Sequence, residues 1–182
     1  EGGGNIIKNL VSLKSLTPTA ITWVSSPKGI STLYNGTTSN LKSTTDLVKT
    51  STGDGKGDFS VVCLANPISE ATQRYMVVQR DGGGSQIQWR FGANYNAGDA
   101  TQAGSLGFTT YSGGFQGATA TSVIDGNWHL FAGVKKGITG NPNMWVYVDG
   151  VLKATAASTQ TTWQTGNVLW VGGLSGGGYN QN

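Results

Sequence analysis

Residues 125–150 read D-G-N-W-H-L-F-A-G-V-K-K-G-I-T-G-N-P-N-M-W-V-Y-V-D-G, and this stretch decides the fold. Two apolar runs, residues 128–134 and 144–148, alternate with period two, which predicts a pair of β-strands. The second run ends on Asp149-Gly150, a dipeptide typical of the type I′ turn because both of its central residues need positive φ. The sequence therefore predicts a two-residue hairpin, with a further strand beginning at Val151.

The alternation also predicts which side chains face the core. In the first run we expect Trp128, Leu130, Ala132 and Val134 to point inward, together with three residues of the second run: Met144, Val146 and Val148. Four residues would then share the outer face and form a candidate ligand-binding surface, because exposed aromatic rings stack on sugars: His129, Phe131, Trp145 and Tyr147. The alternative is that loops or a second layer cover these side chains.

The composition favours a single all-β domain. The chain has 182 residues, a length that suits one domain. Gly accounts for 29 of them and separates short apolar runs together with Thr, Ser and Asn, as in a sandwich with many turns. No long apolar stripe with helical spacing occurs.

Other pieces of the sequence match a known family in order along the chain. They are L-Y-N-G-T at 33–37, G-D-F-S-V at 57–61, V-V-Q-R at 77–80 followed by W-R-F at 89–91, D-G-N-W-H at 125–129, W-V-Y-V-D-G-V-L at 145–152 and V-L-W-V-G-G at 168–173. With these motifs the chain resembles the laminin-G-like branch of the concanavalin A-like lectin/glucanase superfamily. The resemblance implies a two-sheet antiparallel jelly-roll sandwich over residues 1–182. It does not assign a function, since the superfamily contains lectins, adhesion modules, glycosidases and virion domains.

A second hairpin is predicted from residues 75–80 and 86–91, on either side of D-G-G-G-S. Its expected inner set is Met76, Val78, Ile87, Trp89 and Phe91. The opposite face would be polar and suited to sugar hydroxyls, or an ordinary hydrated sheet surface: Tyr75, Gln79, Gln86, Gln88 and Arg90.

The run 59–64, F-S-V-V-C-L, is apolar on both faces, which is typical of a central strand. It contains Cys63, the only cysteine, which we interpret as a small buried hydrophobe. Pairing with His129 as a nucleophile is the alternative, but no orienting third residue or oxyanion motif accompanies it.

The acidic residues do not predict catalysis. Glycosidases place two carboxyls on either side of the scissile bond, and the family's glycosidases carry them as E-x-D-x-x-E. Here the glutamates are Glu1 and Glu70, and neither stands in that pattern, while Asp54 and Asp58 lie in a Gly-rich segment. We therefore expect no enzyme and no cofactor, with His129 holding a neighbouring loop. Calcium is an open alternative, without ligands that the sequence assigns.

Charge and surface composition bear on partners and location. The net charge is +3 with a pI of about 9.0, but the lysines are scattered, so we expect no nucleic-acid binding. No apolar run reaches the length of a membrane span, and the start E-G-G-G-N is not typical of a signal peptide. Glu1 is not an initiator Met, so we expect a processed or excised chain, or an incomplete sequence. A surface rich in Thr, Ser, Asn and Gln is common on extracellular and virion proteins.

Residues 9–37 are similar in style to domains of this fold encoded by tailed bacteriophages. We therefore expect a decoration, fibre or adhesion role on a virion, with other virion or surface-protein subunits as partners and a cell-surface glycan as a weak ligand. The alternative is a secreted bacterial carbohydrate-binding or adhesion module.

Relatives continue after the strand at 168–173 with a further strand of the form F-x-G-x-I-x-x-V-x-I-Y, and this sequence ends before it. A sandwich without that strand leaves an open sheet edge. We expect another segment to cover this edge: residues 5–16, a continuation of the chain, or a strand from a neighbouring subunit.

Overall fold

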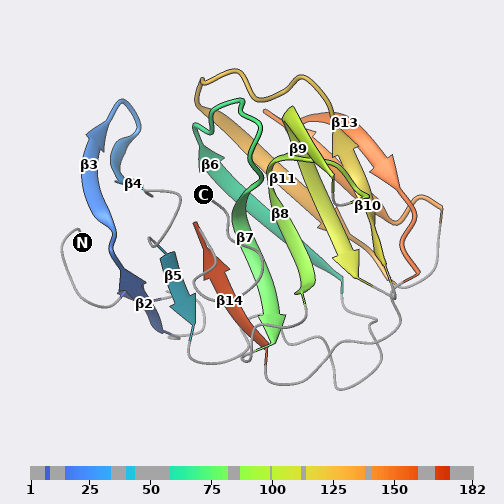
Figure 1. The fold of residues 1–182 in the computed structure, drawn as a ribbon, viewed down its shortest axis with the longest axis horizontal. Coiled ribbons are helices and arrows are strands. Elements are labelled where there is room, and N and C mark those ends of the chain that lie inside the picture. Colours follow the sequence, from blue (N-terminus) through green and yellow to red (C-terminus); the bar gives the residue numbers. More distant parts are fainter. Residues whose placement is uncertain are drawn as a thin grey trace.

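The computed structural model describes residues 7–8, 15–33, 40–43, 58–81, 87–98, 100–111, 114–137, 141–159 and 167–172 (Figure 1). Within these ranges the chain forms fourteen β-strands and no helix. The strands are β1 (Ile7–Lys8), β2 (Ser15–Thr19), β3 (Thr22–Ser26), β4 (Gly29–Leu33), β5 (Asn40–Ser43), β6 (Phe59–Ala65), β7 (Arg74–Asp81), β8 (Ile87–Tyr95), β9 (Thr101–Tyr111), β10 (Phe115–Ala120), β11 (His129–Lys135), β12 (Met144–Val148), β13 (Val151–Ala156) and β14 (Asn167–Val171).

The described strands form two stacked layers. The larger sheet has the order β1-β2-β5-β14-β7-β8-β9-β10, and the smaller sheet has the order β13-β12-β11-β6. All neighbours in both sheets are antiparallel. A separate hairpin of β3 and β4 stands at the left of Figure 1. The predicted two-sheet antiparallel sandwich is confirmed.

The Asp149-Gly150 turn forms as its sequence predicts. Asp149 has φ 51° and Gly150 has φ 79°, the left-handed backbone that a type I′ turn requires. Val148 pairs with Val151 directly across the turn, so only Asp149 and Gly150 separate β12 from β13.

The core between the sheets is built around Phe108 of the larger sheet. Its ring makes edge contacts with Phe59, Trp89 and Phe91 at centroid distances of 5.7, 6.4 and 5.8 Å. From the smaller sheet, Gly133 faces this ring, because a Cβ atom there would lie 2.9 Å from Phe108 Cδ1. Four further side chains of the smaller sheet join this core, each at most 5% exposed: Phe131, Met144, Val146 and Val148.

The run predicted at 59–64 forms β6, which extends one residue further to Ala65, but it does not lie where it was predicted. β6 lies at an edge of the smaller sheet, where β11 is its only neighbour among the described strands. The interpretation as a central strand was therefore wrong within this part of the chain. β1 and β2 lie in the larger sheet, so they do not extend the smaller sheet beside β6.

The hairpin of β7 and β8 forms as predicted, but its inner set is divided. Its register shifts between Tyr75 and Val77 and again between Gln79 and Arg80. A register shift changes which residues face each side of a sheet. Trp89 and Phe91 therefore join the core between the sheets, with Met76 packed against them. Val78 and Ile87 belong instead to a second buried cluster.

Candidate functional site

The surface of the smaller sheet that points away from the core is largely apolar, and we call it the outer face. Pairing across the strands places Leu64 beside Leu130, Val62 beside Ala132, and Ala132 beside Tyr147. Several of its side chains are well exposed: Val62 59%, Leu64 50%, Leu130 46% and Leu152 48%. Its apolar members are Val62, Leu64, Leu130, Ala132, Val134, Trp145, Tyr147 and Leu152, and two polar residues, Ser60 and Thr155, lie beside Val134 and Trp145.

Trp145 and Tyr147 lie side by side on this face. They are two residues apart on β12, and both are partly exposed, whereas Met144, Val146 and Val148 between and beside them are buried. Trp145 pairs with Val134 and Tyr147 with Ala132. Because these β11 side chains are smaller, the two rings have room to present part of their surface to solvent.

The other two residues of the predicted aromatic surface do not join them. Phe131 is fully buried in the core, so β11 presents the face opposite to the one expected. Leu130 is 46% exposed, which contradicts its predicted place in the core. Two residues explain why the Phe131 side of β11 faces the core. Gly133 leaves room for the Phe108 ring, and the buried Lys135 donates a hydrogen bond from its amine to the Gly137 carbonyl at 2.7 Å.

His129 instead links two turns at the end of the smaller sheet. Its Nδ1 lies 2.6 Å from Asp149 Oδ2, and its Nε2 lies 3.0 Å from Asp125 Oδ1. Each carboxylate also accepts a backbone N–H, from Leu130 at Asp149 and from Asn127 at Asp125. We call this group the His129 clasp, and it agrees with the expectation that this histidine holds a neighbouring loop.

The clasp shifts the pKa values of its members. The hydrogen bonds to Asp149 and Asp125 raise the pKa of His129 above 6.5, because both carboxylates favour the protonated ring. Hydrogen bonds from Asn127 and from His129 lower the pKa of Asp125 from 3.8 to about 2. The pKa of Asp149 is also lowered, first by its hydrogen bond with His129. At mildly acidic pH the clasp is therefore a cation held between two anions.

The second predicted surface, the polar face of the β7–β8 hairpin, is buried. Arg90 is fully buried, where its Nη1 donates to Tyr75 Oη at 2.7 Å and its Nε donates to Thr109 Oγ1 at 3.0 Å. Its guanidinium also lies 3.7 Å from the centre of the Phe115 ring. The predicted residues that prove buried are Tyr75 (3% exposed), Gln79 (2%), Gln88 (4%) and Arg90 (0%), and Gln86 lies outside the described residues.

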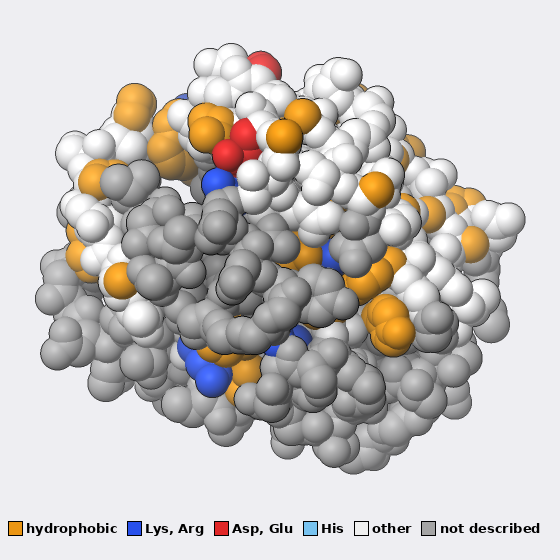
Figure 2. Space-filling model, viewed as in Figure 1, with side chains coloured by type: hydrophobic (Ala, Val, Ile, Leu, Met, Phe, Trp, Pro, Cys, Tyr) orange, Lys and Arg blue, Asp and Glu red, His pale blue; other side chains and the backbone are white. Residues whose placement is uncertain are grey.

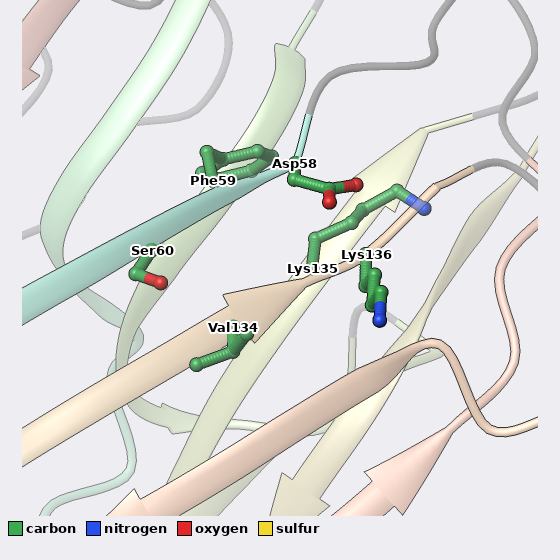
Figure 3. Close-up of a pocket in the computed structure, with 6 residues that line it drawn as sticks. All are labelled: Asp58, Phe59, Ser60, Val134, Lys135 and Lys136. Carbon is green, nitrogen blue, oxygen red and sulfur yellow. The ribbon is translucent and has the colours of Figure 1, made fainter.

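A small pocket of about 220 Å³ opens where β6 begins and β11 ends (Figure 3). It is lined by Asp58, Phe59, Ser60, Val134, Lys135 and Lys136. Asp58 Oδ1 accepts a hydrogen bond from the Gly137 N–H at 2.6 Å. Burial lowers the pKa of Lys135, while the charge of Asp58 acts in the opposite direction. Asp58 and Lys135 both hydrogen-bond to the backbone of Gly137, so these two side chains have structural roles and the pocket does not define a reaction.

Glu70, the glutamate within the described residues, is paired with Arg74. Glu70 accepts two hydrogen bonds from Arg74, at 2.6 Å to Nε and 3.1 Å to Nη2. Within the described ranges no group of three or more His, Cys, Asp or Glu side chains is arranged to hold a metal ion. Asp54 and Glu1 lie outside those ranges. Nor does the described part of the chain contain a helix of the length and hydropathy needed to cross a membrane.

Comparison with protein families agrees with this architecture. A family model described as the concanavalin A-like lectin/glucanases superfamily matches residues 35–182. The chain belongs to this superfamily and is a laminin-G-like domain of it. A search of curated proteins finds no match. Domains of this type are generally carbohydrate-binding or adhesion modules, and some members of the superfamily are glycosidases.

Proposed function

We propose that this domain is a non-catalytic recognition module that binds a glycan on the outer face through Trp145 and Tyr147. The observation that carries this proposal is the pair of partly exposed aromatic rings beside each other on β12. Sugar rings present apolar C–H faces, and aromatic side chains stack on such faces while the Tyr O–H and Trp N–H supply hydrogen bonds at the edge.

The chemistry of the outer face favours a neutral glycan. None of the residues named on this face is charged, and the residues paired with the two rings are Val134, Ala132, Thr155 and Leu152. Figure 2 shows the other side of the molecule, with the larger sheet in front, where the described Lys and Arg side chains appear at separate places. An anionic polysaccharide would find no cluster of basic side chains among the described residues of the outer face.

The absence of catalysis is part of the proposal. It is supported by the engagement of Glu70 with Arg74 and of Asp58 with the Gly137 amide. Incubation with a panel of polysaccharides should release no reducing sugar. Turnover that is lost in Asp58→Asn or Asp54→Asn would overturn this part of the proposal.

The setting that we propose is a virion surface, where the domain serves as a decoration, fibre or adhesion element. Its support is the phage-like style of residues 9–37 and a charged fraction of 12%, about half of the usual ~25%. A secreted bacterial carbohydrate-binding or adhesion module is the alternative, because the same outer face would serve it equally well.

The test is a glycan array followed by titration of the best ligand. Loss of one stacked ring is worth on the order of 1 kcal/mol, so Trp145→Ala and Tyr147→Ala should each weaken binding about fivefold. Tyr111→Ala is the matched control, since Tyr111 is also an exposed aromatic (38%) but belongs to the larger sheet. Unchanged affinity in both β12 variants, with melting temperatures near wild type, would disprove the assignment of the site.

A further inference from the structure

The two edges of the smaller sheet differ in how well they are protected against further pairing. The β13 edge carries Lys153 and a register shift against β12 between Val146 and Tyr147, and β13 also packs against β10. Charges and bulges of this kind prevent an edge strand from pairing with another chain. The β6 edge has neither, since its sequence F-S-V-V-C-L-A is uncharged and its register with β11 is continuous over seven residues.

The side chains of β6 are also incompletely covered on both of its faces. Outward, Val62 is 59% and Leu64 is 50% exposed. Inward, Val61 is buried, but Cys63 and Ala65 are only partly buried although they pack against the core. Residues 60–65 therefore have the sequence of a central strand and lie at an edge where β11 is the only described strand beside them. A chain arriving there would gain backbone hydrogen bonds and apolar contacts together.

We propose that the β6 edge pairs with the β6 edge of a second copy of this chain, which joins the two smaller sheets into one antiparallel sheet. A two-fold axis through Val62 makes the strand complementary to itself. Val62 then lies opposite Val62 of the second copy, Ser60 opposite Leu64, and Val61 opposite Cys63. Leu64 then faces the small Ser60, and no like charges meet because β6 has no charged residue.

The symmetry has a consequence for recognition. A two-fold axis perpendicular to the joined sheet places both outer faces on the same side of the dimer. If the proposed glycan site is correct, two Trp145–Tyr147 pairs would face the same surface, and binding to a repeated glycan would gain from bivalency. The dimer itself rests on the β6 edge and not on the glycan proposal, so each can fail without the other.

The first experiment measures the oligomeric state of the whole chain by light scattering during size exclusion, over a concentration series. The wild type should have twice the monomer mass at the higher concentrations. Val62→Lys should be a monomer, because two lysines would meet directly across the axis. Leu152→Lys is the matched control, with similar exposure (48%) on the protected β13 edge, and it should remain a dimer. A wild type that stays monomeric throughout the series would overturn the proposal.

The second experiment tests the register. Directly opposed residues in antiparallel strands have Cα atoms about 4.5–5.5 Å apart, within the range of about 4.4–6.8 Å that a disulfide spans. In a Cys63→Ser background, Val62→Cys should therefore form a disulfide-linked dimer on mild oxidation. Leu64→Cys in the same background should not, because the two Leu64 positions lie four residues apart along the joined strands. Equal cross-linking of both variants would show random association and would contradict the proposed pairing.

Discussion

Adding a single methyl group at Gly133 should destabilise the protein measurably, because this glycine leaves room for the Phe108 ring. A Cβ atom at this position would lie 2.9 Å from Cδ1 and Cγ of Phe108 and 3.2 Å from Cδ2. Carbon atoms in contact are normally about 3.5–4.0 Å apart, so the ring would have to move by roughly half an ångström or more. Phe108 is fully buried, and three aromatic rings surround it, so it has little room to move.

The size of the effect follows from two opposing terms. Overpacking a core costs about 1–3 kcal/mol, while replacing Gly by Ala restricts the unfolded chain and returns about 0.4–1 kcal/mol. The net loss for Gly133→Ala is then about 1–2 kcal/mol, which lowers the melting temperature of a domain of this size by about 2–8 °C. Thermal and chemical denaturation of the purified variant would measure it.

Two further variants separate this cause from a general effect of mutation. Gly114→Ala is the matched control, because no atom lies within 4 Å of its added Cβ, and its stability should change by no more than about 0.5 kcal/mol. In a Phe108→Leu background, Gly133→Ala should cost less than in wild type, since the atoms that it meets are partly removed. An undiminished cost in that background, or a Gly133→Ala protein as stable as Gly114→Ala, would refute the reasoning.

Three further predictions concern the smaller sheet. His129 should stabilise the fold below its unfolded pKa of 6.5, and this stabilisation should be lost as the pH rises through the raised pKa of the folded state. Asp125 should stabilise the fold above its unfolded pKa of 3.8, and this stabilisation should be lost as the pH falls towards its folded pKa of about 2. The gap in melting temperature between wild type and His129→Gln should therefore be widest from about pH 4 to 6.5, and parallel curves would contradict the clasp. Burial raises the pKa of Cys63 to about 12, so native protein at pH 8 should react with a thiol reagent far more slowly than unfolded protein, and equal rates would oppose this assignment. Leu130→Gln should leave a folded protein whereas Phe131→Gln should not, as judged by circular dichroism. The reverse outcome would mean that Leu130, and not Phe131, faces the core, as the sequence alone predicted.

The sequence by itself determined the strands and their turns. Period-two alternation located β11 and β12, a continuous apolar run located β6, and the need for positive φ at Asp149-Gly150 fixed the hairpin between β12 and β13. These features depend on local geometry, because side chains alternate along any strand and few residues tolerate left-handed backbone. The same patterns were sufficient to predict the antiparallel sandwich. They also placed Trp145 and Tyr147 correctly on the face away from the core.

The facing of β11 was decided only by tertiary structure. Along this strand both faces could be buried, and the more apolar set, which includes Leu130, was the natural choice from the sequence. The structure selects the other set, because Gly133 receives a ring from a strand distant in sequence and Lys135 finds the Gly137 carbonyl for its buried amine. Neither contact is visible in a local pattern.

The edge position of β6 and the burial of Arg90 were decided in the same way. An apolar strand looks alike from its sequence whether one neighbour or two lie beside it, so only the sheet order shows that β6 is at an edge. The sequence predicted that Arg90 lies on a polar surface. In the structure the register between β7 and β8 shifts twice, and Arg90 lies among Tyr75, Tyr95 and Phe115. Local propensity determines which segments are strands, whereas the packing of distant segments determines which of their faces are buried and which of their edges remain open.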